Sequence, residues 1–235
     1  MFHPKAVSKD HLYSFDRPFE EVNIDFGKEN LSIIKFKTSK ERKGIVLFYH
    51  GNMSNVEHYK KYCEFFLRNS YELWMVDYPG FGKTTGKRSE KIMYEQALIM
   101  YELASKEINS DSIVIYGKSI GTGIASYVAA NKNCRQLILE TPYYSLRSLA
   151  KHYLPIYPVG RLVKYSFPVN NYLETVKASI TIFHGTEDEV VPYKQSKQLI
   201  EEKPDISLIT IKNGRHNNLS DFPLFQSTLD SLLQL

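Results

Sequence analysis

One stretch near the middle of the chain, IVIYGKSIGTG (residues 113–123), constrains the fold more than any other. A four-residue apolar run ends at Gly117, a single serine follows at Ser119, and Gly121 and Gly123 precede a segment with helical spacing. Glycines on both sides of one serine indicate a tight strand-to-helix turn that neighbouring backbones approach closely. The residues also match the pattern G-x-S-x-G, in which the serine hydroxyl is lifted above the edge of a sheet.

Short apolar runs alternate with longer stretches of helical spacing along the chain, which is typical of a mostly parallel sheet with helices on both faces. The eight predicted strands cover residues 20–26, 31–37, 44–50, 72–78, 112–117, 136–141, 179–185 and 206–211. The first two alternate polar and apolar residues around the short link GKEN, so we expect them to pair antiparallel. The fold class expected from this pattern is α/β.

Helices are expected between the later strands. The predicted ranges are 55–69, 89–108, 119–131, 192–203 and 221–234. Ser89 and Asp221 are the expected N-caps, and Pro192 is a start signal.

The length and composition favour one domain over residues 1–235, because 43% apolar residues are ample for a single buried core. The segment 142–177 is rich in proline and tyrosine and is too long for an ordinary connection. We expect it to form a cap over the carboxyl edge of the sheet. Its candidate substrate-binding residues are Tyr143, Tyr144 and Tyr157, although packing of the cap onto the core explains them equally well.

The charge balance argues against a nucleic-acid partner. Thirty Lys and Arg residues against 26 Asp and Glu residues give a net charge of +4, which is dispersed along the chain. Weak attraction to an anionic membrane surface remains an alternative.

The two cysteines, Cys63 and Cys134, form no disulfide framework and no metal or redox motif. The first residues contain no apolar signal segment and no run approaches 18 apolar residues, so we expect a soluble protein. The absence of a disulfide framework indicates a reducing compartment. The oligomeric state stays open.

Two apparent phosphate loops fail on spacing. A Walker A loop has a glycine five residues before its Gly-Lys pair, but Asp77 and Ser112 occupy those positions before Gly82 and Gly117. Nucleotide hydrolysis is therefore not expected.

A serine nucleophile needs a base, and the base needs an orienting acid. Two segments that follow predicted strands after Ser119 supply candidates: HGTEDEVVP offers Glu187, Asp188 and Glu189, and NGRHNNL offers His216. Both fall where the catalytic groups of open parallel sheets collect. His216 is the preferred base.

The remaining histidines are weaker candidates for the base. His50 and His184 each precede a glycine at a strand end, where a structural hydrogen bond is expected. His3, His11 and His58 lie before the serine and outside the predicted rim of the site. His152 belongs to the predicted cap, where it could touch substrate.

Acyl transfer also needs donors to the developing oxyanion. The Ile120 N–H, at a helix N-terminus, is one candidate, and the backbone N–H of Asn52 in the motif HGN is the other. The alternative interpretation of the HGN motif is that Gly51 only closes a turn and that the motif donates no hydrogen bond to the oxyanion.

Five motifs, FYHGN, VDYPGFGKTTGKRSE, YGKSIGTG, HGTEDEVVP and GRHNNL, together resemble the α/β-hydrolase-domain serine hydrolases with a short cap. That group includes membrane-associated protein depalmitoylases and many bacterial hydrolases, and the match runs from about Phe19 to the C-terminus. The resemblance implies an α/β-hydrolase fold that needs no cofactor and no metal. It also implies a set of roles: Ser119 as nucleophile, Asp188 as orienting acid, His216 as base, and the Asn52 and Ile120 amides as oxyanion hole.

The activity expected from these residues is hydrolysis of a carboxylic ester or thioester of a small-molecule or lipid-like acyl substrate, through an acyl-enzyme on Ser119. The alternatives are a serine aminopeptidase-like enzyme and a non-catalytic scaffold. The basic cap residues Arg147, Lys151, Arg161 and Lys164 disfavour binding of a substrate amine.

The first residues, MFHPKAVSKDH, lack the cysteines of the depalmitoylases, which weighs against lipidated-protein substrates. We expect a cytoplasmic protein, or a membrane-associated one if an N-terminal anchor precedes this chain.

Overall fold

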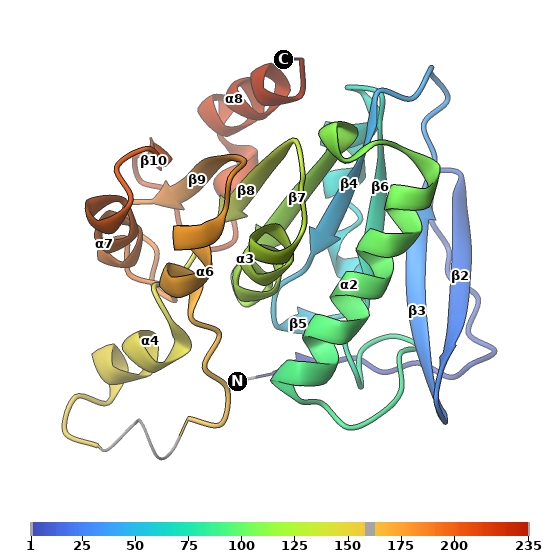
Figure 1. Cartoon of the computed structure of the whole chain (residues 1–235), viewed down its shortest axis with the longest axis horizontal. Helices are drawn as coiled ribbons and strands as arrows, with labels where there is room; N and C mark the ends of the chain where they lie inside the picture. Colours follow the sequence, from blue (N-terminus) through green and yellow to red (C-terminus); the bar gives the residue numbers. More distant parts are fainter. Residues whose placement is uncertain (1, 158–162, 235) are drawn as a thin grey trace.

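The computed structural model describes residues 2–157 and 163–234, which form an eight-stranded sheet between layers of helices (Figure 1). The strand order is β10-β9-β8-β7-β4-β6-β3-β2. The strands are β2 (Phe19–Phe26), β3 (Glu29–Phe36), β4 (Gly44–Tyr49), β6 (Tyr71–Val76), β7 (Ile113–Lys118), β8 (Gln136–Glu140), β9 (Ser179–Gly185) and β10 (Ser207–Ile211). This confirms the α/β fold and all eight predicted strands.

The sheet is mostly parallel. Among these eight strands, only β3 runs opposite to its neighbours, which are β2 and β6. The antiparallel pairing of β2 with β3 is the one that the alternating pattern of the first two strands predicts. The strands from β6 to β10 pair parallel, so their carboxyl ends meet at one edge.

The helices largely follow the predicted ranges. They are α1 (Tyr62–Leu67), α2 (Glu90–Glu107), α3 (Gly121–Asn131), α4 (Leu146–Tyr153), α6 (Val169–Thr175), α7 (Lys194–Glu202) and α8 (Pro223–Gln234). Within the described ranges, none is long and apolar enough to cross a lipid bilayer.

Two helix starts show how local chemistry decides a boundary. The Ser89 hydroxyl accepts the Ile92 N–H and caps α2, as predicted. The prediction that Asp221 caps the last helix is wrong. Asp221 ends a short 3-10 helix, η3 (Leu219–Asp221), and α8 begins at Pro223, which has no N–H to satisfy.

The predicted helix 55–69 divides into a 3-10 turn, η1 (Val56–Tyr59), followed by α1. Asn55 caps η1 by accepting the Glu57 N–H.

Strand residues alternate between two buried layers. On β4, Ile45 and Leu47 belong to the buried cluster that also includes residues of α2, α3, α6 and α7, whereas Val46 and Phe48 belong to the cluster that includes residues of α1 and α8. A period of two sends successive side chains to opposite faces of the sheet. All six residues of β4 and of β7 are buried, which explains their continuous apolar character.

The segment 142–177 contains α4, which lies beyond the carboxyl edge of the sheet, and α6, which packs against α3 (Figure 1). Its returning part is tied to α2, because the Glu90 carboxylate accepts the main-chain N–H groups of Ser166 and Phe167. Arg161, one of the basic residues predicted for the cap, lies outside the described residues.

The beginning of the chain also reaches this edge, which no sequence pattern predicts. Strand β1 (His3–Pro4) pairs in parallel with β5 (Met53–Ser54), directly after the loop that follows β4. The His3 N–H donates to the Asn52 carbonyl over 2.8 Å.

Candidate functional site

Ser119 lies in a crowded turn between β7 and α3 and has a left-handed backbone, with φ of 51°. A methyl group on Gly121 would lie 2.0 Å from the Tyr49 carbonyl oxygen, and one on Gly117 would lie 2.6 Å from the Ala125 side chain. Larger residues at these positions would force the strand and the helix apart. The steric crowding inferred from the glycine spacing is therefore present.

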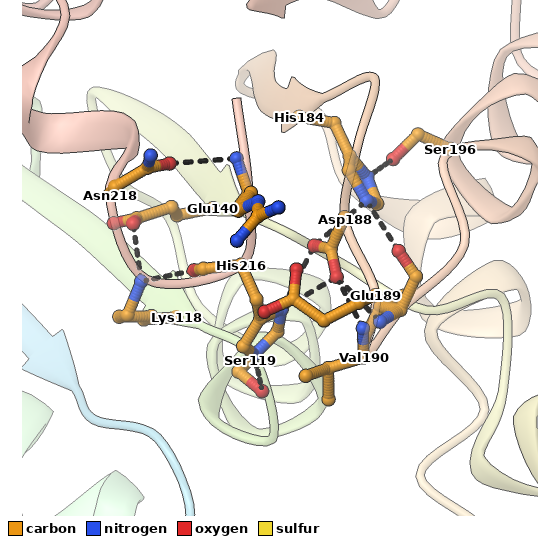
Figure 2. A network of polar contacts seen from close by, with 12 residues as sticks. Lys118, Ser119, Glu140, His184, Asp188, Glu189, Val190, Ser196, His216 and Asn218 are labelled. Atoms are coloured by element: carbon orange, nitrogen blue, oxygen red, sulfur yellow. Dashed lines mark hydrogen bonds and ion pairs between the residues drawn. The ribbon is translucent and has the colours of Figure 1, made fainter. Parts of the chain in front are cut away.

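His216 follows β10 and faces Ser119 (Figure 2). Its Nε2 lies 2.9 Å from Ser119 Oγ, and its Nδ1 lies 2.9 Å from Asp188 Oδ2. Because a carboxylate only accepts hydrogen bonds, Nδ1 carries the hydrogen, and Nε2 can accept the serine hydroxyl. All three residues are at most 8% exposed. This chain of hydrogen bonds can carry the serine proton to the imidazole.

Asp188 is held as a carboxylate in the loop after β9. Its Oδ1 accepts the N–H groups of Val190 and Val191 at 2.8 and 2.7 Å, and His184 Nε2 lies 3.3 Å from Oδ2. Burial favours the neutral acid, but the hydrogen bonds from His184 and His216, the charge of His216 and the Val191 N–H outweigh it. The pKa of Asp188 is therefore well below its ordinary value.

Among the three candidate acids, the structure brings Asp188 to His216. Glu187 and Glu189 are exposed and have no hydrogen bond to His216 within the described part of the chain.

Other histidines make the contacts expected of structural residues. His50 Nδ1 lies 2.7 Å from the Gly51 carbonyl, and His184 Nδ1 lies 2.6 Å from Ser196 Oγ. His152 lines a groove between α4 and α7, away from Ser119.

A cavity of about 280 Å³ opens beside Ser119. Helix α4 forms one wall, and the described lining is mainly apolar. It consists of His3, Asn52, Ser119, Ile120, Tyr143, Leu146, Leu149, Ala150, Tyr153, Val163, Val190 and Val191. No aspartate or glutamate belongs to this described lining.

The prediction that His3 lies outside the rim is wrong, because the pairing of β1 with β5 brings His3 to the cavity. The strand that pairs with it, β5, lies about fifty residues later in the chain. No periodicity or motif near His3 therefore predicts its position at the cavity.

The two oxyanion candidates both line the cavity. Ile120 is the N-cap residue of α3, whose N-terminus carries positive partial charge. Asn52 lies in the loop after β4, next to Gly51, where a methyl group would be 3.8 Å from the Ser119 side chain. The loop therefore passes directly beside the serine.

Of the three tyrosines predicted to bind substrate, only Tyr143 lines the cavity, where its hydroxyl donates to the Ile120 carbonyl over 3.1 Å. Tyr144 instead points its hydroxyl at Glu202, 2.7 Å away. Tyr157 is 55% exposed and is absent from the described lining. The structure thus places Tyr143 at the cavity, and the substrate-binding roles of all three tyrosines stay predictions.

The described residues contain no group of three or more His, Cys, Asp or Glu side chains arranged to hold a metal ion.

Residues 40–168 match the protein family described as "Serine aminopeptidase, S33". The chain belongs to this family. One group of relatives also carries the word hydrolase in its name. Alpha/beta hydrolase domain-containing protein 17C of Mus musculus is 25% identical over 238 residues, which cover 96% of this chain and 70% of that protein.

Solved structures agree on the fold of this family member. The Pyrococcus furiosus esterase Pf2001 has a TM-score of 0.73 at 19% identity, covering 99% of this chain and 98% of that one. A soluble variant of monoglyceride lipase from Saccharomyces cerevisiae has a TM-score of 0.72 at 17% identity, covering 94% and 97%. The chain is thus an α/β-hydrolase-domain hydrolase with the fold that its motifs imply.

Proposed function

We propose that this protein hydrolyses a carboxylic ester or thioester through an acyl-enzyme on Ser119. The observation that carries the proposal is the buried chain of hydrogen bonds from Ser119 through His216 to Asp188. The Ser119 end of this chain lies at the apolar cavity. A serine on a left-handed turn, with its hydroxyl on an imidazole, is the arrangement that activates serine for acyl transfer.

In the proposed reaction, Ser119 Oγ attacks the carbonyl carbon while His216 Nε2 takes the hydroxyl proton. The carbonyl oxygen becomes an oxyanion. The tetrahedral intermediate then expels the alcohol or thiol, which receives the proton from His216. A water molecule, deprotonated by His216, attacks the carbonyl carbon of the acyl-enzyme. The bond from that carbon to Ser119 Oγ then breaks, Oγ takes the proton back from His216, and the carboxylic acid leaves. Asp188 remains ionised and orients the imidazole throughout.

The backbone N–H groups of Ile120 and Asn52 are the proposed donors to the oxyanion. Both residues line the cavity beside Ser119, and the N-terminus of α3 adds a favourable field. Loss of one such donor typically costs about a hundred- to a thousandfold in turnover.

The proposed substrate is a small-molecule or lipid-like acyl ester whose acyl group occupies the cavity. Leu146, Leu149 and Ala150 of α4 supply an apolar wall, and Tyr143 also lines the cavity. We accordingly propose that residues 142–177 act as a cap that shapes the acyl site.

An aminopeptidase is the second candidate, because the family description names one. Such an enzyme needs an acidic group to bind the substrate's amine, and the described cavity lining supplies none. A third candidate is a scaffold without activity, in which Ser119 would never be acylated.

The deciding experiment measures kcat/KM for p-nitrophenyl esters from acetyl to palmitoyl, with Ser119→Ala as the blank. We expect Ser119-dependent turnover with an optimum at one chain length. Aminoacyl p-nitroanilides serve as the parallel series. Ser119-dependent cleavage of anilides alone would favour the peptidase. Failure of a fluorophosphonate to phosphonylate Ser119 would favour the scaffold.

A further inference from the structure

We propose that the buried Lys118–Glu140 ion pair is a positioning device that fixes the loop of His216 against Ser119. The inference rests on the function proposed above. It assigns a role to two residues that touch no substrate but contact both the turn of the serine and the loop of the histidine.

Lys118 connects two elements that lie far apart in the sequence. Its Nζ lies 2.5 Å from Glu140 Oε1 and 3.2 Å from the main-chain oxygen of His216 (Figure 2). The ammonium therefore donates to the residue that supplies the imidazole. Lys118 is 4% exposed and Glu140 is fully buried, so water does not compete for these hydrogen bonds.

Glu140 contacts the turn of Ser119 from the other side. Its main-chain oxygen accepts the Ser119 N–H over 2.9 Å, while its carboxylate binds Lys118. One residue of β8 thus holds the backbone of Ser119 directly and the backbone of His216 through Lys118. The distance between Oγ and Nε2 depends on both connections.

The sheet register places the pair in this position. Lys118, the last residue of β7, lies opposite Glu140, the last residue of β8. Directly opposite residues on parallel neighbours project to the same face, so the two side chains meet beneath the edge that carries the site. Ser119, the next residue along the chain, begins the turn.

The carboxylate of Glu140 is held in a single orientation. The Tyr62 hydroxyl contacts both of its oxygens at 2.9 and 2.8 Å, and the Tyr116 hydroxyl lies 2.5 Å from Oε2. Burial favours the neutral acid, but the charge and hydrogen bond of Lys118, together with the two tyrosines, outweigh it and lower the pKa of Glu140. Glu140 is therefore a carboxylate at neutral pH.

Stability alone does not account for two buried charges at this place. Replacing a buried ion pair by apolar residues is often neutral or stabilising, whereas removing one partner leaves an unpaired charge and is strongly destabilising. The ion pair can contribute to folding stability and to the position of His216. Comparing variants that lack one charge with a variant that lacks both separates these two contributions.

The experiment compares Lys118→Met, Glu140→Gln and the double variant by melting temperature and by kcat and KM for the best ester. We expect Lys118→Met to lower kcat by about tenfold to a hundredfold with KM within about twofold, because small misplacements of catalytic groups are costly. In the double variant no charge is unpaired. We expect its melting temperature to recover while kcat stays low, since the hydrogen bond to the His216 carbonyl is still missing.

Lys35→Met provides a matched control. Lys35 Nζ lies 3.0 Å from Glu107 Oε1, and its side chain is 8% exposed, but it lies on β3, three strands from β7. We expect this variant to lose melting temperature without losing kcat.

Amide hydrogen exchange at residues 213–219 gives a readout that does not depend on activity. We expect faster exchange there in Lys118→Met and in the double variant, and no change in Lys35→Met. Recovery of kcat together with melting temperature in the double variant, or unchanged exchange in this loop, would overturn the inference. Equal activity of Ser119→Ala and wild type would overturn the proposed function instead, and the exchange experiment would still decide the positioning role.

Discussion

The Nε2 atom of His216 lies 2.9 Å from Ser119 Oγ, although 97 residues separate the two along the chain. Ser119 follows β7 and His216 follows β10, and β8 and β9 lie between these strands in the sheet. The loop of His216 therefore reaches back across two strands, past Asp188 at the end of β9. The parallel strands make this contact possible, because their carboxyl ends share one edge.

Removal of the serine hydroxyl should abolish turnover without affecting the fold. For Ser119→Ala and for His216→Ala we expect kcat/KM to fall at least about a thousandfold, because the proposed nucleophile and the proposed base would act as a unit. The melting temperature should stay near that of wild type. Ser231→Ala, on the exposed face of α8, is the control and should change neither quantity. Activity of Ser119→Ala within tenfold of wild type would contradict the assignment.

The three carboxylates after β9 should differ sharply in their effect. Asp188→Asn removes the carboxylate that accepts the His216 Nδ1–H, so we expect a large loss of kcat, smaller than that of Ser119→Ala. Glu189→Gln is the matched control, and it should retain wild-type kinetics because its side chain is exposed. A greater loss in Glu187→Gln or Glu189→Gln than in Asp188→Asn would identify a different acid.

Asp188 should also make stability depend on pH. Its pKa is lower in the folded chain than in the unfolded one, where about 3.9 is usual, so the ionised form stabilises folding above that pH. The contribution is lost as the pH falls further toward the folded pKa. Urea unfolding of wild type and Asp188→Asn from pH 7 to pH 3 should give a free-energy difference that favours wild type at pH 7 and shrinks below about pH 4. A difference that stays constant over this range would exclude the predicted shift.

Filling the cavity should alter the preference for acyl length. Leu149 lines the wall that α4 contributes, so Leu149→Trp should lower kcat/KM for long-chain esters at least about tenfold more than for acetyl esters. Leu224→Trp introduces the same side chain at an exposed position on α8 and should leave the profile unchanged. Equal effects of Leu149→Trp on all chain lengths would show that the acyl group binds elsewhere.

The two cysteine thiols should be unreactive in the folded protein. Burial raises the pKa of both Cys63 and Cys134 to about 12, so almost no thiolate is present at neutral pH. Mass spectrometry should find little labelling by N-ethylmaleimide at pH 7.5 and full labelling in urea, and the treatment should cause no loss of the proposed ester hydrolysis. Rapid labelling without unfolding would contradict the assigned burial.

Local patterns predict the scaffold well because they report local physics. The apolar runs of β4 and β7 are buried on both faces, and the glycines beside Ser119 relieve a clash that any side chain would create. The same reasoning fails where two local signals compete. Asp221 has the chemistry of a cap, but Pro223 is the better first residue of a helix, and α8 begins there.

Sequence patterns alone are enough to derive the order of the strands along the chain, the strand–turn–helix at Ser119 and the loops that carry His216 and its acid. Each depends on periodicity or on backbone sterics within a few residues. Packing of the whole chain selects Asp188 over its two acidic neighbours, brings His3 to the cavity, and turns Tyr144 away from it. It also brings Lys118 and Glu140 beneath the site. These contacts join residues that lie on different strands and loops. Their geometry depends on the register of the sheet and on the paths of the loops, which are properties of the whole folded chain.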